Sequence, residues 1–383
     1  MTLLSLVLVS VVCRLHFRAK TPDSKCVCLR RRLIWVKLAL GSCSPPNAVR
    51  CYEHLGVGDA LSAVAVEPEE SVYRRFDTAE EMLRAPLRSK MLATYGARYF
   101  HVHRADLLDC LLNAVSSNDP DAIATGHVLS SFEETGDRVF AQFENGVAAD
   151  GDVLIACDGI HSVARGILVG DDSPRFTGQF AWRGMVPSEG LPASVVEPNS
   201  VSWLGERKHI IQYGVRGRQF INYVAIVASD EWTEEGWNCR ASASDVVDAF
   251  ADWHPDVLAL IAATPEDGCY KWGLFDREPL DNWTKGRVTL LGDAAHPMLP
   301  FMAQGSAMAV EDAVVLARAL AEDGTASENL RRYENVRRHR TNGIIKKSRQ
   351  ATSLYQRLTG DKSEQRATNL DDVYGYDATK IVL

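Results

Sequence analysis

Residues 288–313 read VTLLGDAAHPMLPFMAQGSAMAVEDA, and this stretch decides the fold. It opens with an apolar run, Val288 to Leu291, that predicts a buried strand, and it leads to a helix predicted over residues 307–320. Free amides at the start of a helix attract anionic or electron-rich groups, and a carboxylate at a strand end can accept hydrogen bonds from a sugar hydroxyl. The stretch therefore predicts a turn that holds a ligand. The simpler alternative is a capped helix in which Asp293 satisfies only backbone donors.

Other strands and helices are predicted on both sides of this stretch. Val153 to Ala156 is a second buried strand, and it runs into Cys157-Asp158-Gly159. Trp, Tyr and Val recur from 176 to 228 with breaks every eight to twelve residues or so, which predicts antiparallel sheet. The helical predictions cover residues 48–55, 83–97 (as helix and turn), 105–115, 245–261, the stretch after 265 and the basic tail from 330. This order of elements is typical of an α/β enzyme.

Length and charge exclude several classes of protein. The chain has 383 residues, of which 46% are hydrophobic and 24% charged, an ordinary globular composition. No stretch approaches the roughly 20 apolar residues that cross a bilayer, so we expect no membrane partner. The net charge of −8 is uneven, because residues 1–40 hold eight Lys and Arg against Asp23 alone (+7), which leaves −15 beyond. We expect no nucleic-acid partner, since a phosphate backbone needs a basic face.

Cysteine usage favours a reducing compartment and predicts no metal site. The nine cysteines form no CxxC pair, and Cys26 and Cys28, with one residue between them, lack the usual zinc spacing. The apolar run from Leu3 to Cys13 has no basic residue before it and no small-x-small cleavage site after it, which favours a buried strand or misfitted sequence over a signal peptide or anchor. We therefore expect a cytoplasmic protein, with membrane or secretory targeting by this run as the alternative.

Three spaced motifs carry a resemblance to a known family. They are HVHRADLLDCL (101–111), DGIHSVAR (158–165) and GDAAHPMLPFMAQGSAMAVEDA (292–313). In that order they resemble the helix whose arginine contacts the FAD pyrophosphate, the DG motif and the second flavin-binding motif of the single-component, FAD-dependent aromatic hydroxylases. Salicylate hydroxylase and 6-hydroxynicotinate 3-monooxygenase belong to that family. SPPNAVRCYEHLGVGDAL (44–61) and YGYDA (374–378) are similar to two further family segments.

The resemblance implies a set of site residues. Those expected to bind the cofactor are Arg104, Asp158, Gly159, Asp293, Pro297, Gly305 and Ser306. The segments AWRG (181–184) and HIIQY (209–213) resemble those that place an arginine and a tyrosine near flavin and substrate, so Arg183 and Tyr213 are catalytic candidates. A structural ion pair and a core tyrosine are the alternatives. His296 is the third catalytic candidate, because an imidazole there could bind or deprotonate a phenolic hydroxyl.

The resemblance also implies the chemistry and the domain plan. FAD would take hydride from NADH or NADPH and form a C4a-hydroperoxide with O2, which hydroxylates a phenol or hydroxy-aromatic acid. A secondary-metabolite hydroxylase or epoxidase of the same family is an alternative. The expected fold is α/β, with a Rossmann-like FAD-binding domain (41–170 and 271–335), an inserted, mainly antiparallel substrate sheet (171–270) and a C-terminal helical tail (336–383). We expect a monomer or a homodimer.

The first 40 residues depart from the family pattern. They contain no glycine, so they lack the GxGxxG turn that lets backbone approach a pyrophosphate, and they lack the acidic residue expected about 20 positions later. We therefore expect residues 1–40 to be an atypical head in which the first βαβ unit is missing or degenerate. Two hypotheses follow. The protein is an FAD-binding monooxygenase with a mis-assigned head, or it is a non-catalytic, FAD-deficient relative that at most binds small aromatics.

Overall fold

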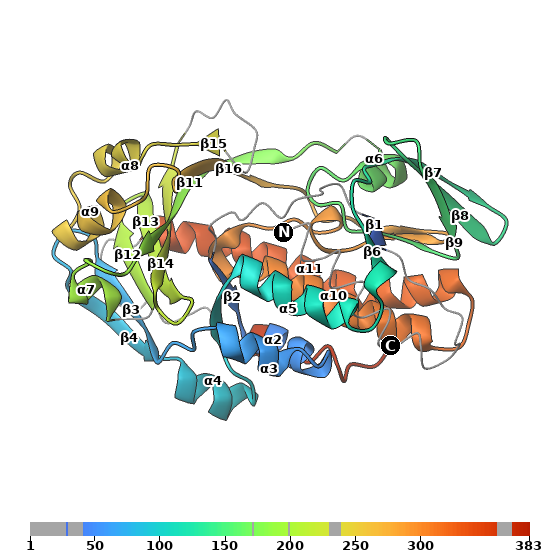
Figure 1. Cartoon of the computed structure of the whole chain (residues 1–383), viewed down its shortest axis with the longest axis horizontal. Helices are drawn as coiled ribbons and strands as arrows, with labels where there is room; N and C mark the ends of the chain where they lie inside the picture. Colours follow the sequence, from blue (N-terminus) through green and yellow to red (C-terminus); the bar gives the residue numbers. More distant parts are fainter. Residues whose placement is uncertain (1–27, 30–40, 171, 198–199, 230–238, 358–369) are drawn as a thin grey trace.

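The computed structural model describes residues 28–29, 41–170, 172–197, 200–229, 239–357 and 370–383. Figure 1 shows a large sheet at one end of the molecule, long helices through its middle and a small three-stranded sheet at the other end. This arrangement confirms the predicted α/β class. The apolar run from Leu3 to Cys13 lies outside the described residues.

The large sheet has eight strands in the order β15-β16-β11-β14-β13-β12-β3-β4. Their bounds are β3 Glu70–Arg75, β4 Glu81–Pro86, β11 Arg175–Pro187, β12 Ser200–Gly205, β13 Lys208–Val215, β14 Phe220–Ala228, β15 Cys239–Arg240 and β16 Tyr270–Asp276. Neighbouring strands are antiparallel except β12 and β3, which are parallel. The predicted antiparallel sheet is confirmed, and it extends beyond 176–228 through strands that come from both sides of that range.

Alternation along the strands gives this sheet two different faces. Trp182 and Ile210 belong to a buried cluster with residues of α8 (Ala243–Ala249) and α9 (Pro255–Ala262), which cover the outer face. Ala181 and Ile226, which lie opposite each other on β11 and β14, point the other way and pack with Phe301. The inner face of the sheet is therefore turned toward the segment that follows β18.

Three helical predictions are wrong wholly or in part, for local reasons. Residues 81–86 pair with β3, so the helix predicted from 83 begins only at Arg88 (α4, Arg88–Tyr95). The helix predicted over 245–261 breaks where Pro255 starts a new helix and His254 caps it by accepting a hydrogen bond from the Asp256 amide. The helix predicted after 265 is absent throughout: a turn at 266–267 leads into β16, which adds to the large sheet.

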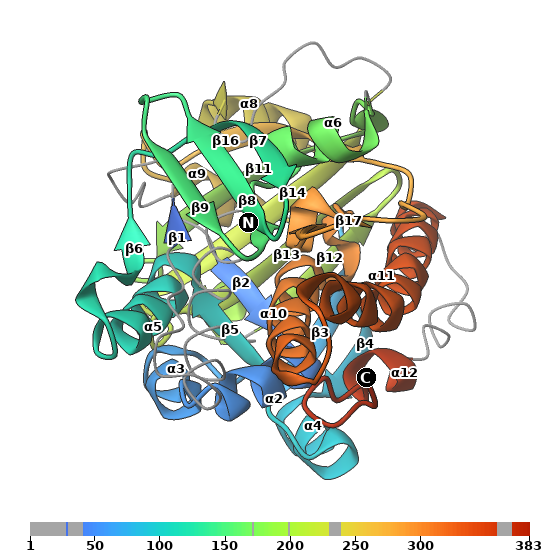
Figure 2. The same cartoon turned by 90° about the vertical axis from the view of Figure 1, so that its right-hand side faces the viewer.

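The elements predicted around residues 292–306 are confirmed. They are the parallel strands β10 (Leu154–Ala156) and β18 (Val288–Leu290) and the helix α10 (Gly305–Ala321). Helix α10 lies beside the long helix α11 (Ala326–Arg357), as both views show (Figures 1 and 2). The remaining elements are β1 Cys28–Leu29, β2 Gly41–Ser44, α2 Pro46–His54, α3 Gly58–Val64, β5 Phe100–His103, α5 Arg104–Ser116, η1 Pro120–Ala122, β6 Ile123–Ala124, β7 Leu129–Thr135, β8 Arg138–Phe143, β9 Ala148–Gly151, α6 Val163–Val169, α7 Ala193–Val196, β17 Thr284–Lys285, η2 Gly292–Ala294, η3 Pro300–Met302 and α12 Asp371–Tyr374.

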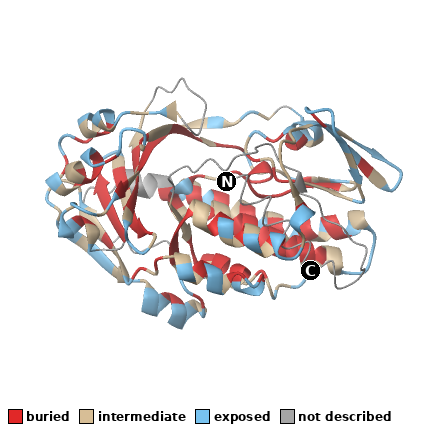
Figure 3. Ribbon diagram, viewed as in Figure 1, coloured by how far each residue is buried: buried red, intermediate tan, exposed pale blue. Residues whose placement is uncertain are grey.

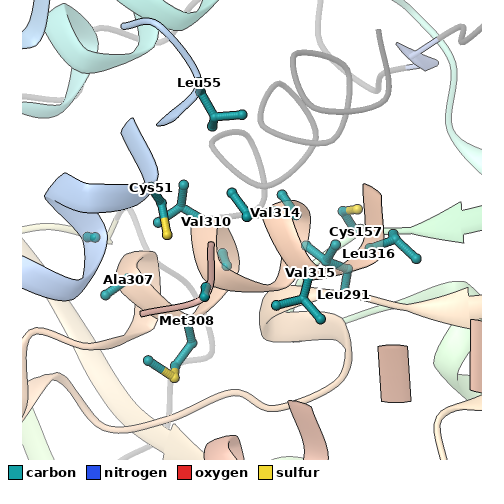
Figure 4. Close-up of a cluster of buried hydrophobic side chains, with 14 of the residues drawn as sticks. Cys51, Leu55, Cys157, Leu291, Ala307, Met308, Val310, Val314, Val315 and Leu316 are labelled. Atoms are coloured by element: carbon teal, nitrogen blue, oxygen red, sulfur yellow. The ribbon is translucent and has the colours of Figure 1, made fainter. Parts of the chain in front are cut away.

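Helix α10 runs through the centre of the main core. Most of its residues are buried, and Figure 3 shows buried segments gathered in the middle of the molecule. Its Val310 and Val314 belong to the same cluster as Cys51 and Leu55 of the α2 region, and Figure 4 shows these side chains around the helix. Burial on all sides fixes the position of the N-terminus of α10. Within the described ranges, no helix is both long and apolar enough to cross a membrane.

Candidate active site

Two of the predicted motifs meet at the carboxyl edge of a parallel strand pair. Ala156 of β10 lies opposite Leu290 of β18, and the Leu291 amide donates to the Ala156 carbonyl at 2.9 Å. Parallel strands end at the same edge, so the residues that follow them, 158–159 and 292–293, come together there. This edge is where open α/β sheets bind ligands.

The segment from 292 to 306, which we call the flavin loop, leads from that edge to the N-terminus of α10. Ala303 adopts the left-handed conformation with φ 52°, and the helix starts two residues later. The Met308 amide donates to the Gln304 carbonyl at 2.7 Å, so the amides of Gly305 and Ser306 precede the first hydrogen bond of the helix. They remain available to an electron-rich group of a ligand.

Arg104 stands at the first position of α5, directly after β5. Burial lowers the pKa of Arg104, and the neighbouring Asp293 carboxylate raises it. Among the residues that the structure describes, none forms a hydrogen bond or ion pair with this guanidinium. A desolvated cation without a protein partner is costly, which indicates an anionic ligand such as a phosphate.

The DG motif holds the flavin loop in place. Asp158 accepts hydrogen bonds from the Ser162 hydroxyl and from the Ala164 amide (3.2 Å), so its carboxylate caps α6. Arg165, only 1% exposed, donates to the carbonyls of Ala294 (3.1 Å) and Ala295 (2.9 Å). Arg165 therefore connects the DG motif to the flavin loop. The contacts of Asp158 and Gly159 with the cofactor stay predictions.

His296 lies in the flavin loop and is 2% exposed. Its Nε2 is 2.5 Å from Oδ2 of Asp312, which also accepts the Gly292 amide at 3.1 Å. A carboxylate only accepts, so Nε2 carries a proton and donates it to Asp312. In the described part of the chain, Nδ1 has no hydrogen-bond partner. Asp312 thus orients the imidazole, and the role of His296 toward a substrate stays a prediction.

Arg183 lies on the inner face of the large sheet. Its guanidinium is 4.6 Å from the ring centre of Trp272 and 5.9 Å from that of Tyr270, both on the neighbouring strand β16. The pKa of Arg183 is lowered to about 9, first by burial and then by the positive charge of Arg104. Arg183 of the sheet and Arg104 of α5 therefore lie close enough for their positive charges to interact, and the Arg183 guanidinium lies over two aromatic rings.

Tyr213 lies on the inner face of β13, beside two other buried polar side chains. Its ring centre is 4.5 Å from that of His101, and its hydroxyl lies within hydrogen-bonding reach of the Cys43 thiol. Burial and the nearby Cys43 raise the pKa of Tyr213 well above its ordinary value. The phenol therefore stays protonated at neutral pH and can donate a hydrogen bond but not act as a base.

Two histidines of this region were absent from the predicted set. His209 lies two positions before Ile211 and four before Tyr213 on the same strand, and its ring centre is 5.7 Å from that of Phe301. Burial lowers the pKa of both His209 and His101 to about 3. The period of two along a strand could have placed His209 on the face of Tyr213. No local pattern could have found His101, which comes from β5.

Gly41, the first residue of β2, is required by close packing against Tyr213. A Cβ on Gly41 would lie 2.5 Å from Cε2 of Tyr213 and 2.9 Å from Cγ of Asn222, whose Oδ1 accepts the Gly41 amide at 2.8 Å. We expect Gly41→Ala to lower the free energy of unfolding by about 1–3 kcal/mol, since the ring must move. Chemical denaturation measures this loss. Gly166→Ala in α6, where a Cβ meets nothing within 4 Å, is the matched control and should be neutral or stabilising.

The described residues suit the flavin, ribityl and pyrophosphate parts of FAD. Arg104 offers a guanidinium to phosphate, Asp293 is a buried carboxylate beside it, and the amides at the start of α10 suit the electron-rich edge of the ring. The predicted atypical head, apart from residues 28 and 29, lies outside the described residues. Strand β1, formed by those two residues, pairs in parallel with β6.

Comparisons with known proteins agree with this geometry. The family model described as FAD binding domain matches residues 26–348. The 3-amino-4-hydroxybenzoate 2-monooxygenase PtnB3 of Streptomyces platensis is 34% identical over 93% of this chain and 91% of its own length. The 6-hydroxynicotinate 3-monooxygenase of Pseudomonas fluorescens is 34% identical over 91% of this chain and 87% of its own.

Solved structures share the fold. Klebsiella pneumoniae HpxO complexed with FAD and uric acid has a TM-score of 0.82 and 27% identity, over 94% of this chain and 88% of its own. A salicylate hydroxylase substrate complex has the same fold, with a TM-score of 0.79 and 23% identity, over 97% of this chain and 93% of its own. These matches do not favour the non-catalytic alternative. The chain belongs to the FAD binding domain family and is a flavin-dependent aromatic monooxygenase, an oxidoreductase whose cofactor is FAD.

Proposed function

We propose that this enzyme uses FAD, NADH or NADPH, and O2 to hydroxylate an aromatic acid that carries a phenolic oxygen. The observation that carries the choice of substrate is the buried Arg183, whose guanidinium lies over the rings of Trp272 and Tyr270. A guanidinium binds a carboxylate in a planar fork, and aromatic walls accept a flat ring. The names of the relatives support this class, since the two monooxygenases act on 3-amino-4-hydroxybenzoate and 6-hydroxynicotinate.

We assign the cofactor to residues at the edge of the parallel strands. Arg104 would bind the pyrophosphate, Asp293 a ribityl hydroxyl, and the amides of Gly305 and Ser306 the oxygen-bearing edge of the flavin ring, with Pro297 packed beside the ring. FAD supplies hydride acceptance and oxygen activation when it is bound. The chain supplies position, charge and exclusion of water. In this proposal residues 41–170 and 271–335 form the FAD-binding domain, 171–270 the substrate domain and 336–383 the tail.

The three catalytic candidates receive different roles. Arg183 would bind the substrate carboxylate. Tyr213, whose pKa is raised by burial, would donate a hydrogen bond to a substrate oxygen. His296 is held by the bond from Nε2 to Asp312, and its Nδ1 has no hydrogen-bond partner among the described residues. It would accept the proton of the phenolic hydroxyl, which makes the ring more nucleophilic.

The deciding experiment measures flavin binding and turnover in one preparation. We expect the purified protein to show a flavin absorption spectrum, directly or after addition of FAD, and to oxidise NADH or NADPH faster when a hydroxy-aromatic acid is present. Each acid is compared with its neutral amide. Arg183→Met should raise KM about tenfold or more for the acid, through loss of a charge-assisted pair, and leave the amide nearly unchanged.

Arg175→Met is the matched control, since Arg175 lies on the same strand with its side chain 62% exposed. A preparation that is colourless after FAD is added and the unbound FAD is removed would rule out the enzyme assignment. An equal rise in KM for acid and amide would remove Arg183 from carboxylate recognition.

A further inference from the structure

A buried ionic network joins helices α10 and α11. Arg337 donates through Nη1 to Oε2 of Glu311 at 2.6 Å and through Nε to Oδ1 of Asp312 at 2.7 Å. All three side chains are 0% exposed. Arg340 adds a second cation, with its Nη2 3.1 Å from Oε1 of Glu311. Two carboxylates and one guanidinium group are therefore fully buried, and the second guanidinium, of Arg340, is 8% exposed.

Asp312 connects this network to the flavin loop. Its Oδ2 accepts both the Gly292 amide and the His296 Nε2–H, while its Oδ1 accepts Nε of Arg337. The pKa of Asp312 is lowered to about 2, because the nearby positive groups and hydrogen bonds outweigh its burial. The carboxylate therefore stays ionised and keeps both contacts with the loop.

The network also orients His296 through Asp312. Oδ2 of Asp312 accepts the Nε2–H of His296, while Oδ1 of the same carboxylate accepts Nε of Arg337. Loss of Arg337 would remove the partner of Oδ1, so the carboxylate would no longer be held in a single orientation toward the imidazole.

The other end of the network holds the segment from 370 to 383, which we call the C-terminal segment. Arg340 donates to the carbonyls of Asp372 and Val373, each at 2.7 Å, and its guanidinium is 4.3 Å from the ring centre of Tyr376. Arg337 also faces that ring, at 5.5 Å. A continuous set of contacts thus runs from the C-terminal segment through Glu311 and Arg337 to the flavin loop.

Stability alone does not account for such a network. Buried ion pairs contribute little net stability compared with apolar residues of the same size, because both partners lose their hydration. They do fix geometry, since each partner has few arrangements that satisfy it. We propose that Arg337 is a positioning residue of the flavin site, which acts through Asp312 to hold the flavin loop and the orientation of His296. This inference rests on FAD occupying the flavin loop, as proposed above.

The test measures FAD affinity and melting temperature in the same variants of the full chain. Arg337→Met leaves the carboxylates unpaired, so Arg337→Lys and Asp312→Asn carry the measurement. Arg337→Lys keeps the charge without the two-pronged contact, and Asp312→Asn keeps the shape without the charge. We expect each to raise the dissociation constant for FAD about tenfold or more and to shift the absorption bands of the bound flavin.

Arg318→Met is the matched control. Arg318 lies on α10 and donates to the carbonyls of Ala378 (2.8 Å) and Ile381 (2.7 Å). It therefore holds the C-terminal segment, and among the described residues it forms no hydrogen bond or ion pair with the flavin loop. We expect this variant to melt at a lower temperature and to bind FAD within about twofold of the wild type, since no loop contact is lost.

The outcomes separate this inference from the proposed function. If the wild-type protein binds no FAD, the assignment of the flavin loop fails. If the wild type binds FAD and Arg337→Lys and Asp312→Asn bind it equally well, the network is only structural and the inference is overturned. The same conclusion follows if Arg318→Met loses as much affinity as they do.

Discussion

Arg104→Met is expected to weaken FAD binding about hundredfold while it raises the melting temperature of the FAD-free protein. A guanidinium that donates two charge-assisted hydrogen bonds to a pyrophosphate contributes roughly 3 kcal/mol to binding, which is more than two orders of magnitude in the dissociation constant. In the FAD-free protein the same cation is desolvated, which lowers its pKa, and only Asp293 counters this charge. An apolar side chain of similar length removes that cost.

Fluorescence titration with FAD and thermal unfolding of the flavin-free protein measure the two effects. Arg98→Met is the matched control, because Arg98 is exposed and its Nη1 donates to the Ser62 hydroxyl at 3.1 Å, away from the site. We expect this control to change neither quantity. An Arg104→Met protein that binds FAD as tightly as the wild type would contradict the assignment of the pyrophosphate to Arg104.

Acidification is expected to destabilise the protein well above the pH at which its ionised carboxylates take up protons. Burial lowers the pKa of His101 and of His209 to about 3, against 6.5 for an imidazole in water. Between these values the unfolded chain holds two more protons than the folded one, so the free energy of unfolding falls as the pH is lowered. The fall is about 1.4 kcal/mol per histidine per pH unit, or roughly 5 kcal/mol for both between pH 6.5 and 4.5.

Two other histidines add to this slope, because burial also lowers the pKa of His54 and His103. Asp312 contributes only at lower pH, since its pKa of about 2 keeps the carboxylate ionised over the whole window. The loss of stability from pH 6.5 to 4.5 therefore comes from the buried imidazoles more than from the ionic network.

Urea unfolding at several pH values measures the dependence. His101→Gln and His209→Gln should each reduce the slope by about 1.4 kcal/mol per pH unit, because glutamine does not titrate. His161→Gln, at an exposed position within residues 158–165, is the control and should leave the slope unchanged. A stability that stays level down to pH 4.5 would show that the two imidazoles reach water in the folded protein.

Much of the fold could be predicted because its signals are local. The apolar runs before residues 158 and 292 and the helices after 104 and 305 follow from periodicity and from their boundary residues. The errors arose where partners distant in the sequence decided the structure. Residues 81–86 are exposed or half-buried, and they form a strand only because β3 pairs with them. Residues 270–276 become a strand in the same way, against β11.

The residues of the site likewise fall into those that the sequence identified and those that only the tertiary structure brought together. The order of motifs in the sequence determined the family, the cofactor and the candidates Arg104, Arg183, Tyr213, Asp293 and His296. Only the tertiary structure placed His101 against Tyr213, Arg165 against the carbonyls of the flavin loop and Arg337 against Glu311 and Asp312. A sequence motif specifies the local backbone conformation and the order of the side chains along the chain. The charge that a buried group carries depends on neighbours from other helices and strands, and these are set by packing.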